Sequence, residues 1–166
     1  MAEDWYIDLS SGKSEAYVAL RQGVRALMAG EPNRTANLAN VTAAIQATFS
    51  WHWVGFYLVD ETRDELVLGP FQGPVACTRL QRGKGVCAAA WTSQATVNVP
   101  DVEAFPGHVA CSSLTRSELV VPVVVDGIVV AVLDIDSRQE ADFDADDEAG
   151  MAGLVQEVEN LWHSWS

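Results

Sequence analysis

The stretch SELVVPVVVDGIVVAVLDIDS, residues 117–137, decides the fold of this chain. Residues 119–125 and 128–135 are dominated by valine, isoleucine and leucine, the composition of buried β-strands. Asp126 and Gly127 between them form a two-residue sequence that favours a tight hairpin turn. The stretch therefore predicts two neighbouring antiparallel strands at the centre of a sheet.

Patterns on either side of this hairpin predict an α+β fold. Residues 51–59 and 66–68 are rich in aromatic and β-branched residues and indicate an earlier hairpin. The order of elements predicts an antiparallel sheet with the N- and C-terminal helices packed on one face. A length of 166 residues suits one domain, residues 1–166. Apolar residues at helical spacing indicate three amphipathic helices, which begin at Ser14, after Asn33 or Thr35, and after the acidic residues Asp144, Asp146 and Asp147.

Residues 69–116, between the two hairpins, have a different composition, in which glycine, proline, serine and other small residues dominate. Short strands are expected at residues 76–80 and 96–99, and a short helix at residues 86–91. Loops held on a rigid scaffold are where binding and catalytic residues concentrate, so we expect this elaborated region to cover the functional site. All three cysteines of the chain fall inside it, namely Cys77, Cys87 and Cys111.

The composition excludes several classes of partner. A formal net charge of −13 at pH 7 would repel nucleic acid and anionic membranes, so neither is expected as a partner. No apolar run approaches the ~18 residues needed to span a bilayer. The first residues, MAEDWYIDLSSGK, lack the basic and apolar segments of an export signal, which predicts a cytoplasmic protein in a reducing compartment. A small molecule or another protein remains as the partner.

The cysteines admit three interpretations. An odd, sparse set of thiols in a chain without an export signal favours reactive chemistry over a disulfide framework. Each cysteine could instead be a small buried apolar residue, since free cysteine is among the most buried residue types. A zinc site with His108 as fourth ligand is disfavoured, because Cys87 lies ten positions after Cys77 and twenty-four before Cys111, too far apart for a zinc knuckle. We predict no metal, no cofactor, and a structural role for His108.

Three carboxylates are expected to share one end of the sheet. Asp134 and Asp136 flank Ile135 near the end of a strand, so the period of two places both on the same face. An isolated pair of this kind is typical of a strand end in solvent. The predicted hairpin, however, brings Glu118 opposite the segment around Ile135, beside both aspartates. Such a cluster can bind the ammonium of a free amino acid, or keep one acid neutral as a proton donor.

Five blocks, in order and spacing, resemble the signature blocks of the free methionine-(R)-sulfoxide reductases, which are small GAF-fold enzymes. The resemblance implies a GAF fold, reduction of the R sulfoxide of free L-methionine, recycling by a thioredoxin-like reductant, and a homodimer. The blocks are GPFQGPVAC at 69–77, GKGVC at 83–87, DVEAFPGHVAC at 101–111, SELVVP at 117–122 and LDIDS at 133–137.

The same resemblance implies roles for individual residues. Cys111 matches the attacking cysteine, Cys77 the resolving cysteine and Cys87 a third, auxiliary cysteine. Glu118, Asp134 and Asp136 match the carboxylates that line the pocket. The chain departs from the family pattern at Ser112, where aspartate is usual, and at Glu103, where histidine is usual. Both departures bear on the tuning of the site more than on the reaction.

The implied chemistry needs more than one thiol. A thiolate attacks the sulfoxide sulfur while an acid protonates the oxygen, which leaves a sulfenic acid and releases methionine. A second thiol then forms a disulfide, which a low-potential dithiol protein can reduce. Glu118 is the predicted proton donor, since it follows Cys111 by only seven positions, and Asp134 and Asp136 are the predicted ammonium ligands.

Other residues complete the predicted pocket. Trp53 and Tyr57 alternate along one strand and are expected to form an aromatic wall around the methyl-sulfinyl group. Lys84 and Arg116 are candidates for binding the substrate carboxylate. Two other functions stay open at this point: a non-catalytic GAF module that binds a small ligand or senses redox state, and a peroxide-reactive thiol sensor.

Overall fold

The computed structural model describes residues 5–166, in which strands and helices follow the predicted order. The strands are β1 (Trp53–Asp60), β2 (Glu65–Gln72), β3 (Arg79–Gln81), β4 (Val97–Val99), β5 (Ser117–Val125) and β6 (Ile128–Ser137). The helices are α1 (Lys13–Met28), α2 (Arg34–Phe49), α3 (Gly85–Ser93) and α4 (Ala145–Leu161), with short 3-10 helices at Val102–Ala104 and Trp162–Ser164. None of the helices within residues 5–166 is long and apolar enough to cross a membrane.

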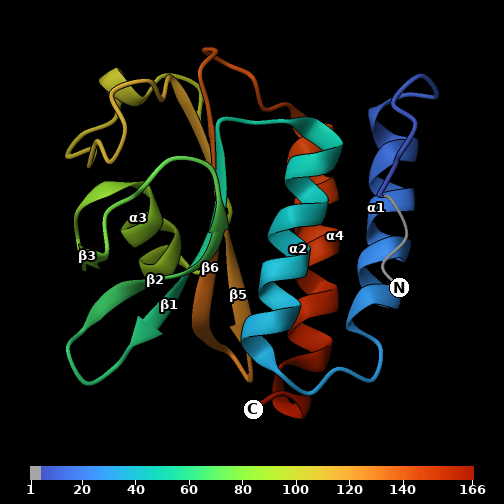
Figure 1. The fold of residues 1–166 in the computed structure, drawn as a ribbon. Helices are drawn as coiled ribbons and strands as arrows, with labels where there is room; N and C mark the ends of the chain where they lie inside the picture. Colours follow the sequence, from blue (N-terminus) through green and yellow to red (C-terminus); the bar gives the residue numbers. More distant parts are fainter. Residues whose placement is uncertain (1–4) are drawn as a thin grey trace.

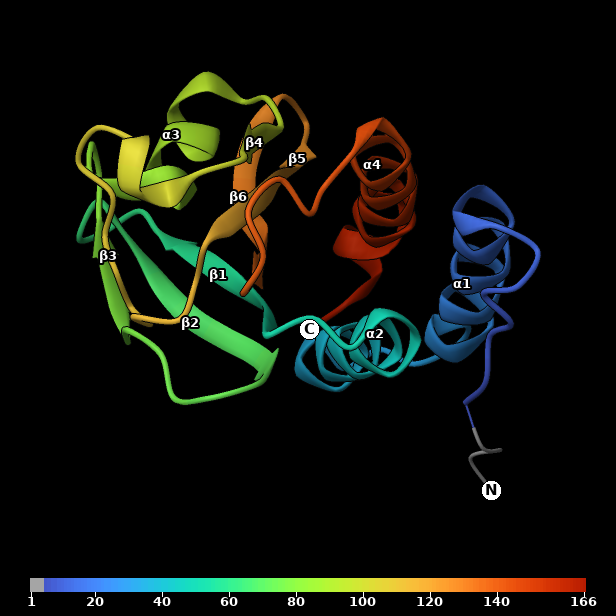
Figure 2. The same cartoon turned by 90° about the horizontal axis from the view of Figure 1, so that it is seen from above.

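The strands form one antiparallel sheet in the order β3-β2-β1-β6-β5-β4. Figure 1 shows α2 and α4 on one side of this sheet and α3 on the other. Seen from above, α1 packs on the outside of α2 and α4 and completes a helical layer (Figure 2). The predicted α+β fold, with the N- and C-terminal helices packed together on one face, is confirmed.

The two faces of the sheet bury different cores. Alternate residues of β1 point to opposite faces, so Val54 and Phe56 enter the core beneath the helical layer. Trp53 and Tyr57 enter a second core, which lies between the sheet and α3. Strand β6 alternates in the same way, and its Ile135 lies in the helical core. The residues on either side of Ile135, which are Asp134 and Asp136, therefore lie on the face of the sheet that α3 covers.

The central hairpin turns where the sequence predicts. Asp126 has a φ of 53° and Gly127 a φ of 78°, the pair of positive values that a type I′ turn requires. A bulge between Val123 and Val124 adds one position to the register, so Glu118 pairs with Asp136 rather than with Ile135. This shift keeps Glu118 on the face of the two aspartates.

Several boundaries differ from the sequence-based predictions by one residue or more. Helix α1 begins at Lys13, one residue before the predicted start at Ser14, and its N-cap is Gly12, whose φ of 110° suits glycine. Strand β2 extends to Gln72, because a register shift opposite Phe56 accommodates Pro70, which has no amide proton to donate. Strand β3 is shorter than predicted and begins only at Arg79.

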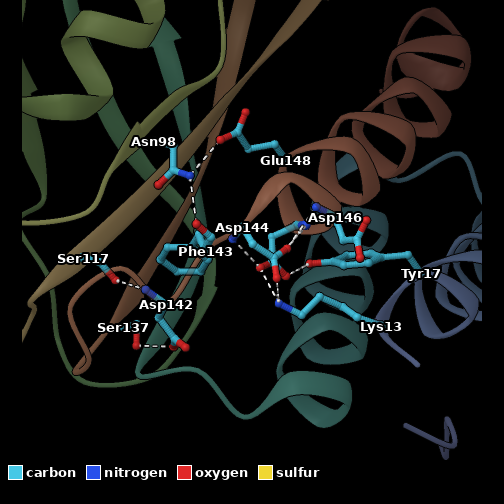
Figure 3. Close-up of polar contacts among 11 residues, drawn as sticks. Lys13, Tyr17, Asn98, Ser117, Ser137, Asp142, Phe143, Asp144, Asp146 and Glu148 are labelled. Atoms are coloured by element: carbon cyan, nitrogen blue, oxygen red, sulfur yellow. Dashed lines mark hydrogen bonds and ion pairs between the residues drawn. The ribbon is translucent and has the colours of Figure 1, made fainter. Parts of the chain in front are cut away.

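Polar contacts fix the connection from β6 to α4, next to the open end of the central hairpin (Figure 3). Ser137 Oγ donates to Asp142 Oδ2 at 2.5 Å, and the Asp142 amide donates to Ser117 Oγ at 3.5 Å. Of the three acidic residues predicted to precede α4, only Asp144 does so, as the N-cap, while Asp146 and Asp147 lie in the first turn. Lys13 of α1 forms an ion pair with Asp144 at 2.9 Å. The ends of β5 and β6 are thereby tied to the helical layer.

Candidate active site

Two of the three cysteines form a disulfide. Cys77, in the loop after β2, is bonded to Cys111, in the loop before β5, with their Cα atoms 5.4 Å apart. The two residues are 34 positions apart in the chain, so the bond joins loops that only the fold brings together. Both side chains are half-buried, so the disulfide is partly exposed to solvent. A disulfide of this kind can be opened and closed by thiol exchange.

The third cysteine has a different environment. Cys87 is a free thiol in the first turn of α3 and is only 3% exposed. Burial is the main cause that raises the pKa of this thiol well above its ordinary value, and the charges of Asp134 and Glu118 raise it further. At neutral pH Cys87 therefore stays protonated and is a poor nucleophile.

Three carboxylates lie together on the α3 face of the sheet. Glu118 and Asp134 are each 6% exposed, and Asp136 pairs with Glu118 across β5 and β6. Glu118 and Asp134 are thus buried and Asp136 is half-buried, so the cluster is not a strand end in solvent. One carboxylate oxygen, Oδ1 of Asp134, is buried without a hydrogen-bond partner. A buried acceptor that lacks a donor costs folding free energy, so a hydrogen bond from a bound molecule to this oxygen would be favourable.

Burial dominates the electrostatics of this cluster. It raises the pKa of Glu118, of Asp134 and of Asp136 well above the ordinary values, because a charged carboxylate is costly in a dry environment. Repulsion among the three carboxylates adds to the increase, with Asp136 acting on Glu118 and Glu118 acting on Asp134. The cluster therefore holds protons at a pH at which exposed carboxylates are charged.

Cys87 of α3 lies next to the same carboxylates. Its Sγ lies 4.0 Å from Oε1 of Glu118, and donor atoms of Cys87, Glu118 and Asp134 all lie within 4.8 Å of one another. That spacing is close to that of a metal site, and without a bound cation burial raises the pKa of all three groups and favours their protonated forms. The same spacing also suits hydrogen bonding and proton donation.

Two hollows give access to the cluster and to the disulfide. The space between atoms, open solvent included, is about 390 Å³ in the first and about 290 Å³ in the second. Cys111 borders both, so a molecule in either can approach its sulfur. Both hollows are lined by Tyr57, Ser112, Asp134 and Asp136; Lys84, Cys87, His108 and Glu118 line only the first, and His52 and Trp53 only the second.

His108 belongs to the site, which the sequence-based analysis did not foresee. Its Nε2 lies 3.3 Å from Oε2 of Glu118, and its ring lines the first hollow. Burial lowers the pKa of His108, which favours the neutral ring. The available signal was its position three residues before Cys111, but no pattern in the sequence pairs it with a residue of a later strand.

Trp53 and Tyr57, the residues of the predicted aromatic wall, lie side by side, and their polar atoms bind the chain itself. Trp53 and Tyr57 are stacked with ring centres 5.9 Å apart. The Tyr57 hydroxyl donates to the Cys77 carbonyl at 2.9 Å, and Trp53 Nε1 donates to the Pro74 carbonyl at 3.1 Å. The two aromatic residues therefore hold the Cys77 loop as well as line the second hollow.

The two basic candidates are separated by the structure. Lys84 lines the first hollow, next to the N-terminus of α3. Arg116 instead forms an exposed ion pair with Glu103 at 2.9 Å, and does not line either hollow. Glu103, one of the two departures from the family pattern, is thus a surface partner of Arg116 in this chain.

Comparisons with known proteins agree with this geometry. The GAF domain family matches residues 33–161. The chain is 51% identical to GAF domain-containing protein A of Dictyostelium discoideum, over 96% of this chain and 100% of that protein. It is 42% identical to the free methionine-R-sulfoxide reductase of Escherichia coli, over 90% of each chain.

A solved structure extends the likeness to three dimensions. It is an X-ray structure of the free methionine-R-sulfoxide reductase of Neisseria meningitidis in complex with its substrate. That protein is 45% identical to this chain, and the two superpose with a TM-score of 0.94 over 98% of this chain and 97% of the other. On this evidence of sequence and fold, the chain belongs to the GAF domain family and, within it, to the free methionine-R-sulfoxide reductases.

Proposed function

We propose that this protein reduces the R sulfoxide of free L-methionine to methionine, with Cys111 as the nucleophile and Cys77 as the resolving thiol. The observation that carries the proposal is the Cys77–Cys111 disulfide beside a buried carboxylate cluster. A cysteine pair alone would fit many redox proteins. A carboxylate cluster at the same cleft adds a site for a cationic, proton-requiring substrate.

The reaction balances with these groups. The Cys111 thiolate and the sulfoxide, with one proton taken up at the oxygen, give methionine and a sulfenic acid on Cys111. The Cys77 thiol then condenses with the sulfenic acid, which forms the disulfide and releases water. A thioredoxin-like dithiol reduces that disulfide by thiol exchange and is itself oxidised. The structure corresponds to the state before this last step, because its disulfide is closed.

The three carboxylates are assigned two roles, ammonium binding and proton donation. The unpaired Oδ1 of Asp134 is a suitable acceptor for the substrate ammonium, whose positive charge would favour the ionised forms of Asp134 and Asp136. Glu118 is the proposed proton donor, because its raised pKa keeps a proton available at neutral pH.

The cluster also has a cost for the nucleophile. A thiol has an ordinary pKa of about 8.5, and nearby negative charge disfavours the thiolate further. The ammonium of a free amino acid would neutralise part of the cluster on binding. We propose that substrate binding thereby lowers the pKa of Cys111 and couples recognition to activation of the thiol.

Three further features belong to the proposal. A disulfide that must be reduced in every cycle suits a cytoplasmic setting, where thioredoxin-like proteins keep thiols reduced. Residues 1–166 are proposed to form one domain, since both cores lie on the same sheet. A homodimer is proposed from the family resemblance and from the outward position of the terminal helices, where Val18 of α1 is 57% exposed.

The proposal is tested by supplying a thiol reductant together with the separated R and S sulfoxides of free methionine, and with a sulfoxide in a peptide. Consumption of the free R form alone is expected. Binding of the sulfoxide without its consumption would instead favour a ligand-binding GAF module. Faster oxidation of the protein by peroxide than by the sulfoxide would favour a peroxide sensor.

A further inference from the structure

A chain of hydrogen bonds ends at the residue next to Cys111. Arg138, directly after β6, donates from Nε to Nδ1 of His52 at 3.0 Å. A guanidinium has only donors, so Nδ1 of His52 must carry a lone pair. The neutral ring then bears its proton on Nε2, which lies 3.0 Å from Oγ of Ser112. Arg138 therefore fixes the tautomer of His52, and His52 donates to Ser112.

The same oxygen accepts a second hydrogen bond. The Leu114 amide donates to Ser112 Oγ at 3.2 Å. A hydroxyl oxygen has two acceptor positions and one proton, so both acceptor positions of Ser112 are occupied from within the chain. Among residues 5–166, no recorded hydrogen bond uses the hydroxyl proton. Ser112 lines both hollows beside Cys111, so this proton is available to a molecule bound there.

We propose that Ser112 donates this proton, as a hydrogen bond, to the sulfoxide oxygen of the bound substrate, and that His52 and Arg138 are positioning residues that direct it. The inference rests on the proposed function. The sulfoxide oxygen is one bond from the sulfur that Cys111 attacks, and Ser112 is the next residue in the chain. Negative charge develops on that oxygen as the thiolate approaches, and an oriented donor stabilises it.

The role differs from that of Glu118. Ser112 keeps its proton throughout, while Glu118 transfers one, and a sulfoxide oxygen can accept from both groups at once. The neutral ring of His52 is favoured by burial and by the charge of Arg138, both of which lower its pKa.

The test compares Ser112→Thr with Ser112→Val, which have nearly the same shape and differ in the hydroxyl. The reduced proteins are mixed with saturating free methionine-(R)-sulfoxide, and the single-turnover rate is measured. Ser112→Thr is expected to stay within about threefold of wild type, and Ser112→Val to fall about 10-fold to 100-fold. Alkylation of Cys111 by iodoacetamide should be the same in both, because this reagent has no sulfoxide oxygen.

Equal single-turnover rates for Ser112→Thr and Ser112→Val would overturn the inference. So would a Ser112→Val protein in which the rate of Cys111 alkylation falls as much as the rate of sulfoxide reduction. Arg138→Leu provides a second measure at an exposed position that can change without disturbing a core. It should slow the wild-type reaction several-fold, yet add nothing in a Ser112→Val background. Additive losses would contradict the chain of contacts. A wild-type protein without any sulfoxide reduction would instead overturn the proposed function, and this inference with it.

Discussion

Glu118 on β5 lies directly opposite Asp136 on β6, and Trp53 on β1 lies opposite the same aspartate from the other side. Asp136 is thus held between a second carboxylate and an aromatic ring. A bulge at Val123 and Val124 sets this register, so an irregularity remote from the site determines which carboxylates lie opposite each other. The chemistry proposed for the cleft depends on that meeting.

Cys111→Ser and Cys77→Ser should fail in different ways. Without Cys111 no thiolate attacks the sulfur, so methionine release should fall by at least about 1,000-fold. Without Cys77 the sulfenic acid still forms, so each chain should release about one methionine and then stall. Quenched single-turnover assays measure both. The reverse pattern, with release only in Cys111→Ser, would exchange the two roles.

Substrate choice should depend on the free amino group. N-acetylmethionine-(R)-sulfoxide has no ammonium to bind Asp134, so its kcat/KM should be at least about 100-fold lower than that of the free sulfoxide. The methyl ester is the matched control, since it keeps the ammonium and loses only the carboxylate charge. Comparable values for the acetylated and free compounds would remove the cluster from substrate recognition.

Neutral replacements should separate proton donation from binding. Glu118→Gln should lower the single-turnover rate at saturating substrate by about 100-fold or more, because the acid is lost. Asp134→Asn should raise KM and leave that saturated rate closer to wild type, because it removes charge from the binding site. Full chemistry in Glu118→Gln would move the proton donor to Asp134 or Asp136.

The ionised form of buried Asp134 should lower the free energy of unfolding. Because the pKa of Asp134 is raised in the folded protein, its favourable contribution is complete below its ordinary pKa and is lost as the pH rises through the raised value. Asp134→Asn should therefore stabilise the protein at pH 8, by on the order of 1 kcal/mol, and less at pH 4. Denaturant unfolding at both pH values measures this. A variant destabilised at pH 8 would contradict the assignment.

Glu157 is a matched control of opposite sign. Its pKa is lowered, chiefly by the hydrogen bond from Arg25, so its contribution is present above its ordinary pKa and is lost as the pH falls through the lowered value. Glu157→Gln should thus destabilise the protein at pH 8, and the loss should shrink in acid. Two buried or nearly buried carboxylates would then respond to pH in opposite directions.

Cys87 should be dispensable for the first cycle. It is buried and its pKa is raised, so it offers little thiolate at neutral pH. Cys87→Ala should keep the single-turnover rate within about threefold of wild type and still form the Cys77–Cys111 disulfide, as peptide mapping would show. A loss comparable to that of Cys111→Ser would make Cys87 the nucleophile.

Local patterns were sufficient for most of the fold. The Asp126-Gly127 turn and the alternation in β6 could be predicted because each depends on a few neighbouring residues. The hairpin placed Glu118 beside Asp134 and Asp136 as predicted, but the predicted register, with Glu118 opposite Ile135, was wrong by one position. The bulge near Val123 could not be predicted, since no glycine or polar residue marks it and its cost is decided by packing on both faces.

Long-range side-chain contacts could not be predicted from the sequence in the same way. His108 and Glu118 come from a loop and a strand, and their contact depends on how that loop folds over the sheet. The same holds for His52, which is distant in the chain from Ser112 and from Arg138. Such contacts follow from tertiary packing, and nothing in the local pattern specifies the partner.

The central claim is that one chain reduces one free sulfoxide and stores the oxidation as a bond between Cys77 and Cys111. The most direct measurement mixes the fully reduced wild-type protein with free methionine-(R)-sulfoxide in the absence of any reductant. Methionine is then counted per chain, and the disulfide is mapped by mass spectrometry. The account predicts about one methionine per chain and a Cys77–Cys111 disulfide. Oxidised protein without released methionine, or methionine with these two cysteines still reduced, would contradict it.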